Sequence, residues 1–278
     1  LIQEGNLGLI KAAEKFNLVS GSGITTDNKT NINAKNIDIL GGIAATDTTV
    51  TANQRLTIGA SGTIQTAENI DLNAENVVVA GGLQTNNANI QVSENFTAHQ
   101  GSQIAAANKI SVDSKRSDIE GEVTAKDIQI KASENLNLLT SSHLSAQESL
   151  KLDANNIALA GDIRAKSTDI SAQQKLDLER TALIEAANKV ILKANTGVVQ
   201  GQIISNDLNI QANDGLEITK TAQLKGIDTT RLAAKNLSID GNIQTKNAIL
   251  TAVDSLTLQQ HALIEASNKA AFDSNTNL

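Results

Sequence analysis

The sequence predicts an all-β fold, a parallel β-helix of about fourteen turns of about twenty residues, with three short strands per turn. The 278-residue chain aligns with itself every twenty residues without an insertion. Within each row of twenty, apolar residues recur at every second position, which is the period of a strand with one buried face. We therefore expect residues 1–278 to form a single β-helix repeat segment in which each turn contacts only its neighbours.

The row from residue 61 to residue 80 shows the elements of one turn in order. Gly, Ser or Thr opens this row and almost every other, which indicates a corner. The alternating segment 70–74 predicts one strand with an apolar face, and 77–79 predicts the next. Asn76 stands at the corner between these two strands, and a third strand is expected near Leu83.

Neighbouring rows are not alike, and this predicts a forty-residue repeat made of two different turns. Position 12 of the rows alternates between large and small apolar residues. We expect large side chains of one turn to interdigitate with small ones of the next, as in other close-packed interiors. The large set is Ile32, Leu72, Val112, Leu152, Leu192, Leu232 and Phe272, and the small set is Ala12, Ala52, Val92, Ala132, Ala172, Ala212 and Ala252.

Leucine-rich repeats are an alternative, because their period is similar and they also carry Asn at a fixed position. Such repeats follow one strand with a helical or 3₁₀ segment. Here the alternation typical of a strand resumes after each Asn, as in Val77 and Val79 after Asn76. This favours the β-helix.

The composition indicates a core of small aliphatic side chains. The chain has no Pro, Cys, Met, Trp or Tyr, and Phe16, Phe96 and Phe272 are its only aromatic residues. Hydrophobic residues nevertheless make up 40% of the chain, so low hydrophobicity does not argue for disorder. Ala, Val, Ile and Leu supply almost all of this apolar content.

The charge pattern argues against a nucleic-acid partner and against a membrane-spanning helix. The net charge is −7, both signs are scattered, and neither a basic stripe nor stacking aromatics are present. The longest apolar runs, such as residues 77–80, are far shorter than the roughly 20 residues that cross a bilayer. The first residues show no signal-peptide pattern. We expect the chain to be an internal fragment of a longer protein.

No cofactor, metal or catalytic residue is expected from the motifs. His99, His143 and His261 fall in rows five, eight and fourteen, too far apart to share one metal ion. The glycine pairs lack the calcium-binding pattern Gly-Gly-x-Gly-x-Asp. Asp113 and Asp153 share a row position two turns apart, about 10 Å, near the upper limit for an inverting glycosidase pair. Without long loops to form a cleft around them, we interpret both as solvated.

The repeated rows of the sequence resemble a known family. Rows such as GDIRAKSTDISAQQKLDLER (161–180) and GGLQTNNANIQVSENFTAHQ (81–100) are similar to the filamentous-haemagglutinin repeats of two-partner-secretion exoproteins. The shared pattern is Gly-x-Ile-x-Ala, then Ile-x-Ala, then Leu-x-Leu, and it covers the whole chain. The resemblance implies a right-handed parallel β-helix. The Asn-Pro motif of that family's amino-terminal transport domain is absent, since the chain has no Pro.

The resemblance also implies a function. Such segments are shafts of large adhesins or of contact-dependent growth inhibition effectors, secreted through an outer-membrane two-partner-secretion transporter and displayed at the bacterial cell surface. We expect a non-enzymatic shaft that presents an adhesive or toxin-delivery module at a distance from the cell. The alternative is a face of the solenoid that binds a receptor protein or glycan, with Lys131 beside Lys151 as the best candidate. A polysaccharide-active enzyme ranks last.

Overall fold

A computed structural model describes residues 9–274, and these residues form sixteen β-strands and no helix. Accordingly, nothing in this part of the chain is a helix that is long and apolar enough to span a membrane. The strands are β1 (Ile10–Lys11), β2 (Lys15–Leu18), β3 (Gly23–Thr25), β4 (Lys29–Ile39), β5 (Gly42–Ile58), β6 (Thr63–Val79), β7 (Gly82–Ala98), β8 (Gln103–Ile119), β9 (Glu122–Leu138), β10 (His143–Leu159), β11 (Asp162–Leu178), β12 (Leu183–Val199), β13 (Gln202–Ile218), β14 (Gln223–Ile239), β15 (Asn242–Leu258) and β16 (Leu263–Ser274).

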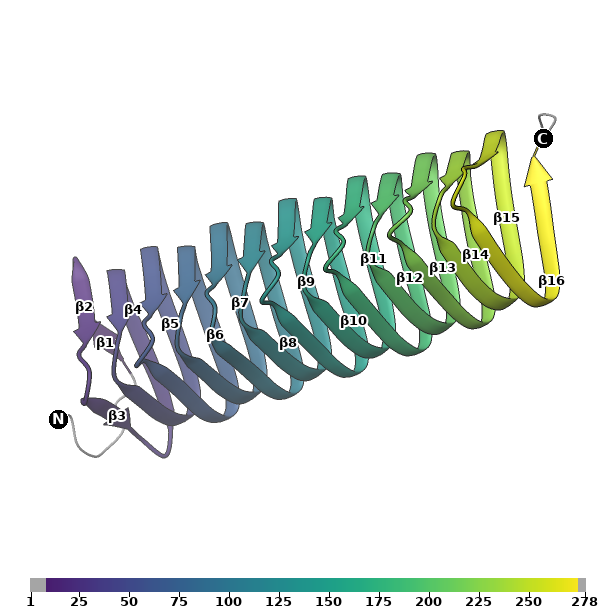
Figure 1. The fold of residues 1–278 in the computed structure, drawn as a ribbon. Helices are drawn as coiled ribbons and strands as arrows, with labels where there is room; N and C mark the ends of the chain where they lie inside the picture. Colours follow the sequence, from purple (N-terminus) through teal and green to yellow (C-terminus); the bar gives the residue numbers. More distant parts are fainter. Residues whose placement is uncertain (1–8, 275–278) are drawn as a thin grey trace. The chain divides into compact units, whose positions relative to one another are not determined.

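The chain divides into two compact units, and each is a stack of parallel strands. The first unit ends at Ser133 and also contains Ser141–Gln147; the second contains Glu134–Thr140 and the chain from Glu148 onward. In the first unit, β4 to β8 form a series in which each strand pairs with its neighbours in the chain. In the second unit, β11 to β16 form a series of the same kind. Figure 1 shows one long strand coiling through most of each turn. The predicted all-β solenoid class is confirmed. That residues 1–278 form one domain stays a prediction.

Each long strand consists of three segments separated by two corners. Where β12 pairs with β13, the register shifts between Ala186 and Lys189 and again between Ala194 and Thr196. The pairing of β11 with β12 shows two such shifts as well. The three predicted short strands per turn are therefore present as three segments of one strand, and the corners are the bends between them.

The loops between long strands alternate in length, and this alternation is the basis of the forty-residue repeat. Two residues separate β6 from β7, whereas four separate β7 from β8. As a result, Ile58 pairs with Val79, which is 21 residues later. Val79 pairs in turn with Ala98, which is 19 residues later, so the two offsets lie on either side of twenty. The same alternation occurs in the second unit, where Leu178 pairs with Val199 and Val199 with Ile218. The predicted forty-residue repeat is confirmed.

The predicted packing of large against small side chains in neighbouring turns is wrong. In the central segment Val50 pairs with Leu72, and Leu72 pairs in turn with Ile90 instead of with Val92, which shares its row position. The side chains of Val50, Leu72 and Ile90 are all buried and form one column of large residues. Ala52 pairs with Ala74 in a separate column of small ones. The predicted interdigitation assumes a constant period of twenty, and the central segment does not keep that period.

Polar side chains line the second corner of the turns, where Asn was predicted. The Nδ2 atom of Asn95 donates a hydrogen bond of 2.8 Å to Oδ1 of Asn76. In the second unit, Nδ2 of Asn156 donates to Oδ1 of Asn135 at 3.1 Å. The amides of neighbouring turns thus satisfy one another beside the backbone ladder, while the interior next to them is aliphatic.

Gly81 is required by close approach of two loops. It lies in the two-residue loop before β7, and a Cβ atom there would overlap the backbone oxygens of Gly59 and Gly62 in the preceding four-residue loop. Gly41, Gly121, Gly201 and Gly241 occupy the same place and are equally crowded by backbone or side-chain oxygens. The glycines that open alternate rows therefore bring consecutive loops together.

Candidate binding site

The three histidines lie at or next to four-residue loops. His99 accepts a β-turn hydrogen bond from the backbone N–H of Ser102, and His143 is the first residue of β10. His261 belongs to the loop between β15 and β16. Within residues 9–274, no group of three or more His, Cys, Asp or Glu side chains could hold a metal ion.

Each of the two pairs that the twenty-residue spacing suggested is divided between the two units. Asp113 is exposed on β8 and pairs with Gln91, whereas Asp153 lies on β10 in the second unit. Lys131 and Lys151 are likewise divided between the two units. All four residues lie in central segments, where the known registers between neighbouring turns deviate from the period of twenty by two positions in one direction or the other. This removes the basis for treating Lys131 and Lys151, twenty residues apart, as neighbours. The deviations cancel over the forty residues between Asp113 and Asp153, so the separation of about 10 Å expected for the two aspartates stays a prediction.

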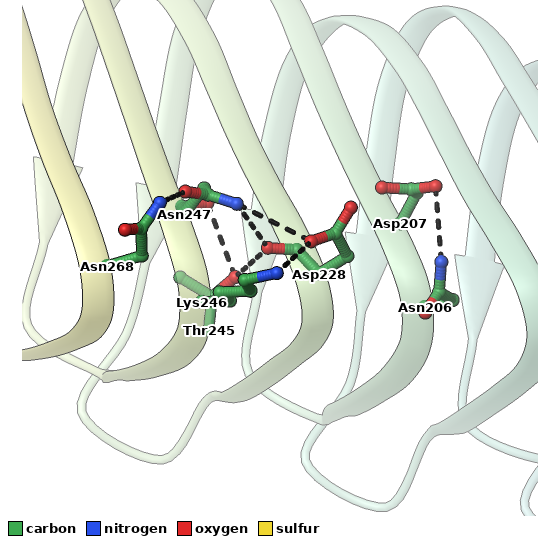
Figure 2. A network of polar contacts seen from close by, with 7 residues as sticks. All are labelled: Asn206, Asp207, Asp228, Thr245, Lys246, Asn247 and Asn268. Carbon is green, nitrogen blue, oxygen red and sulfur yellow. Dashed lines mark hydrogen bonds and ion pairs between the residues drawn. The ribbon is translucent and has the colours of Figure 1, made fainter.

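A network of polar contacts holds the first corner of the turns between β14 and β16 (Figure 2). The Nδ2 atom of Asn247 donates to the backbone oxygen of Asp228 at 3.3 Å, and Oγ1 of Thr245 donates to the same oxygen at 3.3 Å. Asn268 donates to Oδ1 of Asn247 at 2.7 Å. Lys246 Nζ lies 3.7 Å from Oδ1 of Asp228, an exposed ion pair that contributes about 0–1 kcal/mol. The network fixes the corner without enclosing a reactive group.

A groove of about 630 Å³ lies beside this corner. Gly226 and Ile227 form part of its wall, and Ile227 is 61% exposed. Lys225 and Glu265 bring opposite charges to the same groove. Its lining is mixed in charge and polarity, so it does not select one class of ligand.

The loops on either side of β12, β13, β14 and β15 form a continuous edge, which we call the turn edge (residues 179–182, 200–201, 219–222, 240–241 and 259–262). The four-residue loops are β-turns, in which Ala222 N–H donates to the Thr219 oxygen at 2.9 Å. Oγ1 of Thr221 donates to the Gln200 oxygen in the adjacent two-residue loop, also at 2.9 Å. Successive loops therefore follow one another at the strand spacing of about 4.8 Å.

The turn edge of the second unit already binds one carboxylate of the chain itself. Oδ1 of Asp240 accepts a 2.9 Å hydrogen bond from the backbone N–H of His261 and lies 3.1 Å from Nδ1 of its ring. This backbone hydrogen bond is the main reason that the pKa of Asp240 is lowered, and the His261 ring and Lys220 lower it further against the opposing effect of desolvation. In the first unit, Oε2 of Glu120 accepts from the backbone N–H of Gln100 at 3.4 Å. These β-turns thus present N–H groups that suit a carboxylate.

A second groove, of about 510 Å³, lies on the turn edge. Arg180 and Lys220 are the second residues of two four-residue loops and bring two positive charges to it. Three amide side chains start neighbouring strands in one column, since Gln202 pairs with Gln223 and Gln223 with Asn242. The groove is lined by Arg180, Gly201, Gln202, Lys220, Thr221, Ala222, Gln223 and Asn242.

Sequence reasoning missed this groove, although one signal for it was available. Arg180 and Lys220 close successive forty-residue units, and at the same position of the forty-residue repeat Gln100, Thr140 and Gln260 carry no charge. Two cations in adjacent repeats of an otherwise uncharged position mark a departure from the pattern. Which other side chains accompany them depends on loop lengths, which the alignment in rows of twenty had concealed.

Comparison with known protein families, with curated proteins and with solved structures finds no match to this chain. Function must therefore be argued from the fold and from the turn edge. The groove offers fixed positive charges and amide groups, which can bind an anion through charge and hydrogen bonds. That the chain is not an enzyme stays a prediction.

Proposed function

We propose that this chain is a shaft segment of a secreted bacterial exoprotein, a non-enzymatic spacer that presents an adhesive or toxin-delivery module away from the cell surface. The observation that carries the proposal is the regular alternation of loops. From β4 to β16, every loop between strands has two or four residues. Each forty-residue repeat therefore adds length, and loops of this size are too short to surround a substrate.

Secretion and display are part of the same proposal, and they are supported by the resemblance of the repeats to filamentous-haemagglutinin repeats. An outer-membrane two-partner-secretion transporter would recognise a domain other than these repeats. The absence of Cys is compatible with that route, because no disulfide could close a loop in a chain that crosses the membrane unfolded.

The spacer proposal predicts which deletions the solenoid tolerates. Removal of residues 63–102 joins the four-residue loop 59–62 to β8 in place of β6. Two-residue and four-residue loops still alternate, and every remaining side chain keeps its inward or outward direction. Removal of residues 63–82 is the matched control. It joins the same loop to Leu83, which turns the apolar residues of the first segment outward. We expect the forty-residue deletion to fold and the twenty-residue deletion to disrupt the first unit.

The change in length can be measured with spin labels, because the chain has no Cys of its own. Asn33→Cys and Asp113→Cys place two labels on exposed positions of one column, four strand spacings or about 19 Å apart. Electron paramagnetic resonance should report about 10 Å after the forty-residue deletion. Loss of the β-sheet circular dichroism signal in that variant would show that the repeats are not interchangeable, and the spacer proposal would fail.

A further inference from the structure

The carboxylates on the turn edge show what the groove at Arg180 and Lys220 lacks. Asp240 is the first residue of its two-residue loop, and it faces Lys220 and His261. The equivalent residue between the loops of Arg180 and Lys220 is Gln200, which carries no charge. At residue 240 the chain thus has an internal anion next to a cation. One forty-residue repeat earlier, at residue 200, it has two cations with an amide between them.

The polar groups of this groove are available to a ligand. Within residues 9–274, Arg180 forms no ion pair, and the side chains of Gln202, Gln223 and Asn242 form no hydrogen bond to other side chains or to backbone. Gln223 and Asn242 are exposed and Gln202 is half-buried. Gly201 cannot carry a side chain, because a Cβ atom would lie 2.5 Å from the oxygens of Glu179 and Ala182, and so no side chain at this position enters the groove.

We propose that this groove binds the carboxylates of an acidic polysaccharide, a chain of uronic acids. A ligand carboxylate beside Gln200 would lie between Arg180 and Lys220. This position is equivalent to that of the Asp240 carboxylate in the next forty-residue repeat. The amide column supplies donors and acceptors for sugar hydroxyls at intervals of about 4.8 Å, and the three loops from Arg180 to Lys220 span about 10 Å, enough for two sugar units. The lining offers no apolar floor for the side chains of a peptide. This inference does not depend on the shaft proposal.

The test is binding of fluorescently labelled oligogalacturonate to the full chain, measured by anisotropy. The double variant Arg180→Gln with Lys220→Gln should bind at least about tenfold more weakly, because two charge-assisted contacts are removed. Gln200→Asp should weaken binding to a similar extent while it leaves both cations in place, since its carboxylate would fill the site as Asp240 does. Lys193→Gln, an exposed lysine of the central segment, is the control and should bind like the parent.

Several results would overturn the proposal. If the parent does not bind oligogalacturonate, or if Lys193→Gln weakens binding as much as the double variant does, no uronate site exists in the groove. Undiminished binding by Gln200→Asp would show that the ligand does not occupy the position next to residue 200. Tighter binding of dextran sulfate or of poly-glutamate would assign the groove to sulfated glycans or acidic peptides instead. The groove variants change loop residues alone, and Lys193→Gln changes one exposed residue of β12, so matching circular dichroism spectra separate loss of binding from loss of fold.

Discussion

Adjacent glycines at the start of β7, Gly81 in the loop before it and Gly82 as its first residue, should respond in opposite ways to the same substitution. In Gly81→Ala, the new Cβ atom would lie well inside 3.0 Å of two backbone oxygens, those of Gly62 and Gly59. Backbone cannot move aside as a flexible side chain does, so the two loops must separate. In Gly82→Ala, the nearest atom is Cγ2 of Thr63 at 3.6 Å, an ordinary contact. Both variants add one methyl group, and only the first should disturb the fold.

The expected cost follows from the hydrogen bonds that hold the two loops together. Gly82 N–H donates to the Gly62 oxygen at 3.0 Å, and Gly81 N–H donates to the Ile58 oxygen at 3.3 Å. Each buried backbone group that loses its partner costs about 1–3 kcal/mol. Gly81→Ala should therefore lower the free energy of unfolding by about 2–4 kcal/mol. Gly82→Ala should change it by less than about 1 kcal/mol, and in the stabilising direction if loss of freedom in the unfolded chain dominates.

Urea unfolding followed by far-ultraviolet circular dichroism measures this difference, since the chain has neither Trp nor Tyr to report by fluorescence. A cost of about 3 kcal/mol corresponds to a midpoint roughly 1 M lower. Repeat arrays can unfold in parts, so the slope of the transition must be compared as well as its midpoint. Equal midpoints for Gly81→Ala and Gly82→Ala would refute the close approach of the two loops.

Two further predictions concern polar groups. The hydroxyl of Thr48 is buried without a partner, so Thr48→Val should raise the free energy of unfolding by about 1 kcal/mol. Thr66→Val should lower the free energy of unfolding by a similar amount, because Thr66 shares a 2.7 Å hydrogen bond with Thr85. Equal effects of the two substitutions in urea unfolding would contradict this. Asp240→Asn should destabilise the chain above pH 3.8, the ordinary pKa of Asp. The difference in stability between variant and parent should vanish as the pH falls through the lowered pKa of Asp240, because both side chains are then neutral. A difference in stability that persists in thermal unfolding at pH 2 would contradict this prediction.

The residues that face the core could be predicted from the sequence, whereas their partners in the next turn could not. Val50 and Ile70 share position 10 of the rows, yet Val50 pairs with Leu72. An error of two positions leaves every inward side chain inward, since strand side chains alternate with a period of two. The central segments deviate from the period of twenty by two positions in opposite directions, so the deviations cancel over one forty-residue repeat. Alignment therefore revealed the repeat and hid the register.

The candidate site was less predictable for a related reason. Its cations, Arg180 and Lys220, are visible in the aligned rows, but the contrast between Gln200 and Asp240 has meaning only once the order of loops along the turn edge is known. That order depends on the β-turns and on the glycines that let loops approach one another. Backbone contacts of this kind leave a weak trace in composition, because Ser61, Gly101 and Thr181 all occupy equivalent loop positions.

The regularity of the solenoid also explains where specificity can reside. Most inward positions are apolar, strands must keep their length, and the glycines of the two-residue loops are crowded by backbone in the preceding loop. Outward and loop positions are free of these limits, so they can change without a shift of register. Residues 180, 200, 220 and 240 are such positions, and together with His261 they distinguish an edge that binds its own carboxylate from one that is open to a ligand. A spacer built from repeats can thus acquire a binding site through a few loop substitutions, with no change in fold.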